Sequence, residues 1–282
     1  FSTELPVDGM QAGADIVVQS THKILGALSQ ASLLHCRRQR ISVPRLETML
    51  QLTQSSSPNY ILLASLEAAV RQMAEAGPEL VERALRLART ARDRIQEIPG
   101  LFCFGAERLG APGVFAHDPT KLAVTVSGLG IQGNDAEMWL RCVGKVQAEL
   151  SDWNNVLFLV TQADDQVTVA RLTDALQELS REHSGGAARS QALFVPLPAA
   201  ETLLALSPRE AMFSRREPVS FAAAAGRICA ETVTCYPPGI PILVPGERVT
   251  PAVVQYCQAL RQQGFTILGP EDPTLNTLEV VA

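Results

Sequence analysis

Ser20, His22 and Lys23 bring a hydroxyl, an imidazole and a primary amine together in one short segment. They follow an apolar, β-branched run, residues 14–20, which predicts a buried strand whose end opens into a cavity. Partial desolvation at such a place favours the free amine of a lysine, which attacks carbonyl groups. In an extended backbone Ser20 and His22 share one side, and Thr21 and Lys23 share the other. The segment therefore predicts a site for an anionic cofactor that carries an aldehyde at one end and a phosphate at the other.

The spacing Ser-x-His-Lys is not specific by itself, because it is short and a lysine that follows a strand is common at a protein surface. The flanking residues add specificity. Residues 19–23 (Gln-Ser-Thr-His-Lys) and 30–35 (Gln-Ala-Ser-Leu-Leu-His) resemble the pyridoxal-phosphate lysine segment of the bacterial ornithine/lysine/arginine (Orn/Lys/Arg) decarboxylase family. This resemblance implies that Lys23 carries the cofactor as an internal aldimine. It also implies that Ser20 lies at the phosphate and that His22 lies against the cofactor.

A second segment, residues 230–241, resembles the C-terminal domain of the same family. It reads Ala-Glu-Thr-Val-Thr-Cys-Tyr-Pro-Pro-Gly-Ile-Pro, and no general packing requirement explains the run from Tyr236 to Pro241. Its prolines fix φ and remove hydrogen-bond donors, which predicts a rigid loop that leads to a short edge strand. Glu231 is the candidate for binding the distal, cationic end of a substrate. The alternative is that its carboxylate only holds a loop.

The composition indicates a globular protein with a large core, since 46% of the 282 residues are hydrophobic and 19% are charged. A net charge of -5 gives no electrostatic basis for binding nucleic acid, and four dispersed histidines predict no metal site. Six cysteines without Cys-x-x-Cys spacing favour reduced thiols. No apolar stretch reaches the ~20 residues of a membrane span, and no signal peptide is recognisable. We therefore expect a cytoplasmic protein.

Strand and helix patterns alternate after the first motif. Pro44 suits a first helical position and predicts a short helix. Ser57 before Pro58 predicts the cap of a longer helix, and Gly77-Pro78 predicts its end. Further strands are expected at residues 30–36, 122–127, 156–161, 265–268 and 278–281, helices at 79–98, 134–150, 167–182, 221–230 and 251–263, and a linker at 184–189.

The element order and the two resemblances imply the α/β class. We expect residues 1–76 to form the remainder of a pyridoxal-phosphate-dependent transferase-like large domain of fold type I, the architecture of aspartate aminotransferase. Residues 77–186 are expected to form a connector helix and a small α/β domain. Residues 187–282 are expected to form a C-terminal Orn/Lys/Arg decarboxylase domain.

Two motifs of the family are not found in this sequence. The first is of the Asp-Glu-Ala-His type, which supplies a carboxylate under the pyridine nitrogen and a histidine that stacks on the ring. The second is an earlier Ser/Thr-Gly turn that cradles the phosphate at a helix N-terminus. We therefore expect the chain to be the C-terminal part of a longer enzyme, which by itself binds pyridoxal phosphate poorly and is inactive.

The resemblance implies decarboxylation of lysine, arginine or ornithine to the corresponding amine, a reaction of polyamine biosynthesis, by a homodimer or larger homo-oligomer. We expect no nucleic-acid or membrane partner. Two alternatives stay open. One is another fold-type-I enzyme, such as an aminotransferase or a cysteine desulfurase, although the apolar residues 24–28 differ from the glycine-rich segment of desulfurases. The other is a non-catalytic fragment.

Overall fold

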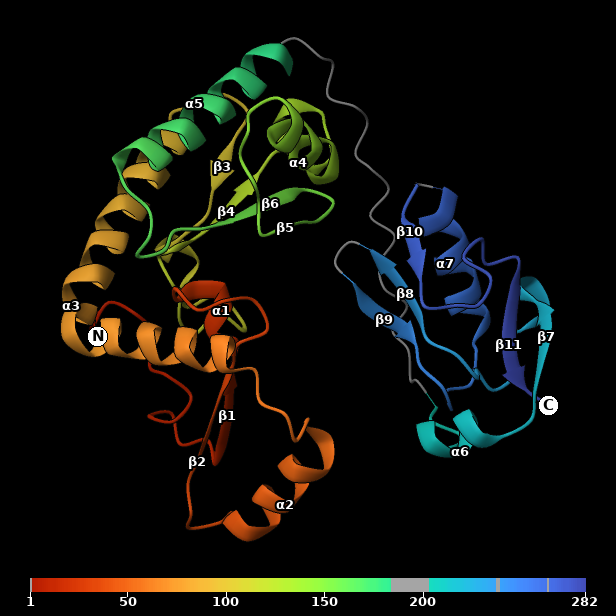
Figure 1. The fold of residues 1–282 in the computed structure, drawn as a ribbon. Helices are drawn as coiled ribbons and strands as arrows, with labels where there is room; N and C mark the ends of the chain where they lie inside the picture. Colours follow the sequence, from red (N-terminus) through yellow and green to blue (C-terminus); the bar gives the residue numbers. More distant parts are fainter. Residues whose placement is uncertain (1, 184–202, 237–238, 263) are drawn as a thin grey trace. The chain divides into compact units, whose positions relative to one another are not determined.

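The computed structural model describes residues 2–183, 203–236, 239–262 and 264–282 and shows a mixed α/β protein (Figure 1). The chain divides into two compact units. Unit 1 comprises Phe1–Glu149 and Asn154–Gly186, and unit 2 comprises Leu150–Trp153 and Ala187–Ala282. The linker expected at 184–189 lies outside the described residues. Within the described ranges, no helix combines the length and the apolar character that a membrane crossing requires.

Unit 1 begins with a hairpin and a short helix. β1 (Ile16–Gln19) pairs antiparallel with β2 (Leu33–Cys36), and α2 (Val43–Thr53) confirms the helix expected next. The strand expected before Lys23 is therefore present, but its expected burial is wrong, because Ile16 is 41% exposed and Val18 is 67% exposed. The reason is that β1 and β2 form a sheet of only two strands in the described part of the chain.

A single helical turn, α1 (Thr21–Ile24), lies between the two strands of the hairpin. The Leu25 N–H donates to the Thr21 carbonyl at 2.9 Å and closes this turn. The extended backbone expected here is therefore wrong. Successive residues of a helical turn point about 100° apart, so His22 and Lys23 do not alternate across a strand.

The serine-rich turn before the long helix caps it through an unexpected residue. α3 (Tyr60–Gln96) begins after Asn59, whose Oδ1 accepts the backbone N–H groups of Ile61 and Leu62 at 3.1 and 3.2 Å. Ser57, the expected cap, lies too far upstream, because a cap serves N–H groups two or three residues further along the chain.

α3 is one helix of 37 residues, so the end expected at Gly77-Pro78 is wrong. Figure 1 shows the helix changing direction between its orange first half and its tan second half. A proline inside a helix removes one hydrogen bond and clashes with the preceding turn, which produces such a kink. The helix continues because apolar side chains are buried on both sides of Pro78, with Met73 before it and Leu85 and Ile95 after it.

The second half of unit 1 is a layer of antiparallel strands covered by helices (Figure 1). The strand order is β3 (Phe102–Cys103), β4 (Lys121–Thr125), β6 (Asn155–Leu159). The two-residue β5 (Leu150–Ser151) precedes β6 in the chain and belongs to unit 2. The helices are α4 (Gly133–Cys142) and α5 (Gln166–His183), with 3₁₀ turns at Ala106–Arg108 and Ser127–Leu129. Alternate residues of β4 and β6 are buried and join α3, α4 and α5 in one core.

One expected boundary in this layer is wrong. α4 ends at Cys142, whereas the sequence predicts a helix to residue 150. Gly144 packs so closely on α5 that an added Cβ would lie 3.0 Å from the Cβ of Ala175. Lys145 then takes a φ of 55°, which lies outside the right-handed helical region. Close packing and this backbone turn therefore end the helix early.

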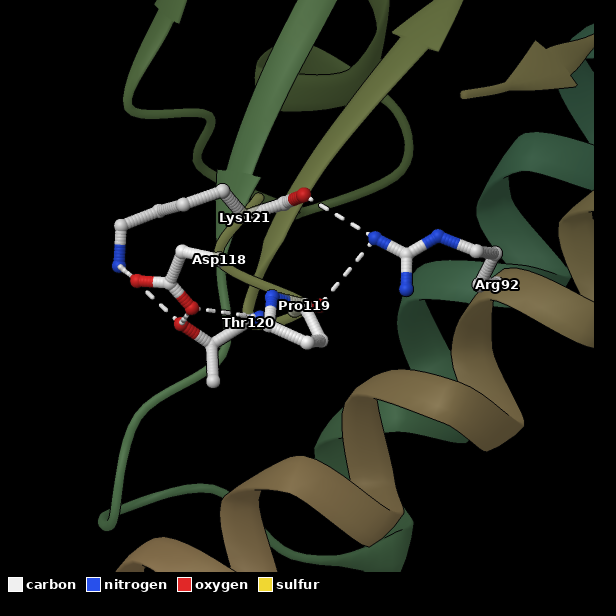
Figure 2. Close-up of polar contacts among 5 residues, drawn as sticks. All are labelled: Arg92, Asp118, Pro119, Thr120 and Lys121. Carbon is white, nitrogen blue, oxygen red and sulfur yellow. Dashed lines mark hydrogen bonds and ion pairs between the residues drawn. The ribbon is translucent and has the colours of Figure 1, made fainter. Parts of the chain in front are cut away.

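Arg92 of α3 holds the turn that enters β4, as Figure 2 shows. Its Nη2 donates to the carbonyl oxygens of Pro119 and Lys121, each at 3.2 Å. In the same turn the Asp118 carboxylate accepts the Thr120 N–H at 2.9 Å and the Thr120 hydroxyl at 2.7 Å, and it pairs with Lys121 Nζ at 3.2 Å. Burial alone would raise the pKa of Asp118, but the hydrogen bonds from Thr120 and the charge of Lys121 hold that pKa below its ordinary value.

Unit 2 contains two antiparallel sheets around a core of its own. β7 (Arg216–Ser220) pairs with β11 (Thr277–Val281), and β8 (Val233–Tyr236) lies between β9 (Ile240–Leu243) and β10 (Thr266–Leu268). The helices are α6 (Pro208–Phe213) and α7 (Pro251–Gln262), with a 3₁₀ turn at Phe221–Ala223. These elements share one buried apolar cluster. The expected C-terminal helix and strands are thus confirmed, and β9 is the expected edge strand.

The helix expected at 221–230 is wrong, since only the short 3₁₀ turn forms there. Gly226 has a φ of 86°, and Ile228 and Cys229 form β-bridges with Arg248 and Val280. Pairing with distant segments therefore overrides the helix propensity of the alanine run. Pro237 and Pro238 of the expected rigid loop lie outside the described residues.

Replacing Asp118 with asparagine tests the turn that enters β4. The pKa of Asp118 is lower in the folded than in the unfolded chain, so the carboxylate stabilises the fold above the unfolded pKa, about 4. This contribution is lost as the pH falls through the folded pKa. We expect Asp118→Asn to lower the free energy of unfolding by about 1 kcal/mol at neutral pH, and by less in acid. Urea unfolding at pH 7 and pH 3 measures both values. Asp174→Asn, on the exposed side of α5, is the control, and an equal loss for Asp118→Asn at both pH values would contradict the role of its charge.

Candidate functional site

Lys23 is the third residue of α1, directly after the first strand of the hairpin. Its backbone N–H donates to the Ser20 carbonyl at 3.2 Å. Its neighbour Thr21 is only 4% exposed and fixes the turn, whereas the side chain of Lys23 is 55% exposed. The fold therefore fixes the backbone of this residue and leaves its amine accessible to a small carbonyl compound.

The Lys23 amine contacts the carboxylate of Glu149. Nζ lies 3.3 Å from Oε1, and the two residues are 126 positions apart in the sequence. The Glu149 N–H donates to the Leu157 carbonyl at 2.9 Å, which fixes this residue beside β6, and its side chain is 31% exposed. Sequence reasoning missed Glu149, because it belongs to no motif and only the fold brings it to Lys23.

Ser20 and His22 lie in the same turn as Lys23. Ser20 precedes α1 at the N-cap position, but its hydroxyl makes no capping hydrogen bond, and the residue is exposed. The His22 N–H donates to the Ala31 carbonyl at 3.3 Å, which ties the turn to the segment that leads into β2. The structure thus brings the three residues of the predicted cofactor site together on one turn of backbone.

Glu231 lies in unit 2, shortly before β8. It is 8% exposed, and both of its carboxylate oxygens accept backbone N–H groups, Oε2 from Glu271 at 2.8 Å and Oε1 from Glu279 at 2.9 Å. A buried carboxylate bonded in this way holds two segments of backbone in place. This geometry supports the structural alternative for Glu231, and substrate binding by this residue stays a prediction.

An open groove of about 390 Å³ lies in unit 1 between the end of α4 and the outer side of α5. Its lining residues are Val143, Gly144, Val167, Ala170, Arg171, Asp174, Ala175 and Glu178. None of the residues of the predicted cofactor site lines this groove, so the site at Lys23 is assigned from its amine and not from a cavity. In the described ranges no group of histidine, cysteine and acidic side chains could hold a metal ion.

The cysteines provide no reactive thiol in the core of unit 2. All six cysteines are free, in agreement with the expected reduced thiols. Burial raises the pKa of Cys229 and Cys235 to about 11 and that of Cys257 to about 12. Such thiols stay protonated at neutral pH and are poor nucleophiles.

Two family models match the chain. The model described as Orn/Lys/Arg decarboxylase, major domain, matches residues 1–168. The chain belongs to the Orn/Lys/Arg decarboxylase family. A second model, Orn/Lys/Arg decarboxylase, C-terminal domain, matches residues 187–269. The first match includes Lys23, and the second includes Glu231.

Curated relatives carry names from this family. The arginine decarboxylase of Bacillus subtilis is 41% identical over 281 residues, which cover 100% of this chain and 57% of the relative. The constitutive lysine decarboxylase of Escherichia coli is 25% identical over 306 residues, which cover 82% of this chain and 43% of the relative. The chain therefore spans about half the length of these relatives.

The fold of this chain resembles the solved structures of lysine decarboxylases. The enzyme from Francisella novicida gives a TM-score of 0.80 at 20% identity, over 95% of this chain and 49% of that chain. The constitutive enzyme of Escherichia coli gives a TM-score of 0.78 at 20% identity, with the same coverage. At this identity the likeness shows the fold alone, and it confirms the α/β class.

Glu231→Gln tests whether the buried carboxylate is structural. A glutamine side chain has one acceptor oxygen, so one of the two backbone N–H groups of Glu271 and Glu279 would lose its partner. We expect the free energy of unfolding to fall by about 2 kcal/mol, measured by urea denaturation. Glu217→Gln is the matched control in the same unit, because Glu217 pairs with Arg227 at 2.6 Å while 49% exposed, and we expect it to cost below about 1 kcal/mol. Equal stabilities of the two variants would contradict the structural role.

Proposed function

We propose that this family member acts in the decarboxylation of a basic amino acid with pyridoxal phosphate as cofactor, and that Lys23 bonds to the cofactor. Arginine is the first candidate substrate, and lysine and ornithine are the others. The relatives that match at 41 to 42% identity are named arginine decarboxylase, whereas those at 25 to 27% are named lysine decarboxylase. This ranking supports arginine.

The observation that carries the proposal is the accessible amine of Lys23, held on one turn with Ser20 and His22. A lysine whose side chain is 55% exposed can form a covalent bond to an aldehyde through its amine. The Ser20 hydroxyl, which makes no capping hydrogen bond, can donate to a phosphate. The imidazole of His22 can lie against an aromatic ring. These groups therefore fit the aldehyde, the phosphate and the ring of pyridoxal phosphate.

Pyridoxal phosphate, when bound, supplies a conjugated ring that takes up the electrons released with CO2. The residues of this chain would bind the cofactor and the substrate and would move protons. Lys23 would hold the cofactor through its amine. When it is not bonded, the Nζ atom of Lys23 could hold a proton for the reacting carbon. Ser20 and His22 orient the cofactor.

The architecture and the assembly follow from the same proposal. Residues 1–76 would belong to a fold-type-I large domain, residues 77–186 to the connector helix and small domain, and residues 187–282 to the C-terminal decarboxylase domain. We propose a cytoplasmic homodimer or larger homo-oligomer. Large apolar side chains at the end of α2 and the start of α3 support a protein surface that is covered in the assembly, since Leu52 is 72%, Tyr60 77% and Ile61 71% exposed.

Reductive trapping tests the role of Lys23. The protein as its own gene encodes it is incubated with saturating pyridoxal phosphate, reduced with borohydride and digested, and the phosphopyridoxyl label on Lys23, Lys121 and Lys145 is measured by mass spectrometry. We expect the label at Lys23 to exceed that at Lys121 and Lys145 at least about tenfold, because Ser20 and His22 add binding contacts at Lys23 alone. Lys23→Ala should remove the excess label. Equal labelling of the three lysines would contradict the proposal.

Release of CO2 tests the reaction class in the protein as its own gene encodes it. Arginine, lysine and ornithine are supplied separately with pyridoxal phosphate, and we expect arginine to give the fastest release. Lys23→Ala should abolish the release from each substrate, because the covalent anchor is lost. Transfer of the amino group to a keto acid without CO2 release would favour an aminotransferase instead.

A further inference from the structure

Lys23 differs from the other lysines of the chain in the partner of its amine. The sequence contains three lysines, Lys23, Lys121 and Lys145. Lys121 pairs with Asp118, three residues before it in the same turn. Lys145 Nζ donates to the Cys142 carbonyl at 2.6 Å, also three residues away. In the described part of the chain, the amine of Lys23 instead pairs with a carboxylate 126 positions away.

The fold places both partners of this ion pair through their backbones. On one side, Thr21 is buried and the Lys23 N–H is bonded to Ser20. On the other side, Ala148 is 6% exposed, and the Glu149 N–H is bonded to the Leu157 carbonyl. The pair itself is half exposed, and ion pairs of this kind add little to stability. Its effect is therefore on the position of the Lys23 amine and not on the fold.

We propose that Glu149 is a positioning residue for Lys23, which holds the Nζ atom while no carbonyl compound is bonded to it. The inference rests on the proposed function, in which this nitrogen forms a covalent bond. In that step the Lys23 ammonium gives one proton to solvent, the nitrogen forms a double bond to the aldehyde carbon, and the aldehyde oxygen leaves as water. The ion pair with Glu149 must break before the nitrogen attacks, and it re-forms when the nitrogen is released.

The inference predicts that the reactivity of Lys23 toward aldehydes depends on salt. At 0.01 M salt the ion pair holds the nitrogen, whereas at 1 M salt the Debye length falls to about 3 Å and the attraction is screened. The Lys145 amine is bonded to a neutral carbonyl, so its reactivity should not change. Lys121 pairs with Asp118 and should respond to salt as Lys23 does, independently of Glu149.

Reductive methylation of the full chain with formaldehyde and cyanoborohydride measures these reactivities. Formaldehyde is neutral and small, so salt does not steer it and no cofactor contacts are needed. We expect the methylation rate of Lys23, relative to Lys145, to rise about two- to fivefold between 0.01 M and 1 M salt in the wild type. In Glu149→Gln the rate at Lys23 should already be high at low salt and should not change with salt. Glu149→Asp should retain part of the salt dependence, because its charge remains.

Glu75→Gln is the matched control, since Glu75 forms an exposed ion pair with Arg71 on α3 and should leave Lys23 unchanged. Equal low-salt rates at Lys23 in the wild type and in Glu149→Gln would overturn the inference, whichever lysine carries the phosphopyridoxyl label. A wild-type rate at Lys23 without salt dependence would also overturn it and requires no variant. The phosphopyridoxyl label on Lys23 tests the proposed function, and the methylation rates test the role of Glu149. The two proposals can therefore fail independently.

Discussion

The packing of α3 is the constraint on which the rest of unit 1 depends. Ala88 and Ala91 are fully buried on its inner face, together with Ile95. The small side chains of the two alanines let α3 approach the sheet closely. Arg92 can then reach the carbonyl groups at the start of β4. The first half of α3, before Pro78, holds the segment after α1, because Ser65 Oγ accepts the Leu28 N–H at 3.2 Å. One kinked helix therefore contacts both the Lys23 segment and the α/β layer.

This arrangement explains how residues far apart in the sequence form a candidate site. Lys23 belongs to the hairpin side of α3, and Glu149 belongs to the layer that packs on its other half. A helix broken at Pro78 would let the two halves move separately, whereas one continuous helix links them. The ion pair between Lys23 and Glu149 therefore joins a residue on the hairpin side of α3 to a residue of the α/β layer.

Local signals in the sequence predicted the parts of the fold that local physics decides. The alternating apolar patterns of β4 and β6 and the 3.6-residue period of α5 and α7 were sufficient, because each pattern matches the burial of its own element. Sequence patterns gave wrong predictions where contacts with distant segments compete with the local preference for helix or strand. Pro78 did not end its helix, because the core on both sides outweighs one lost hydrogen bond. The alanine run after Phe221 did not form a long helix, because Ile228 and Cys229 bond to distant segments.

Glu231 and Glu149 show why the sequence predicted only part of the candidate site. Glu231 was singled out because it stands beside a specific motif, but both of its oxygens are occupied by backbone N–H groups in a buried place. Glu149 stands beside no motif, yet its side chain is 31% exposed and contacts an amine. A carboxylate can exchange one partner for another only where the present partner is easily lost, and a half-exposed ion pair meets this condition while a buried pair of backbone bonds does not. Burial and partner, which only the folded chain determines, therefore separate a carboxylate that holds the fold from one that can act on Lys23.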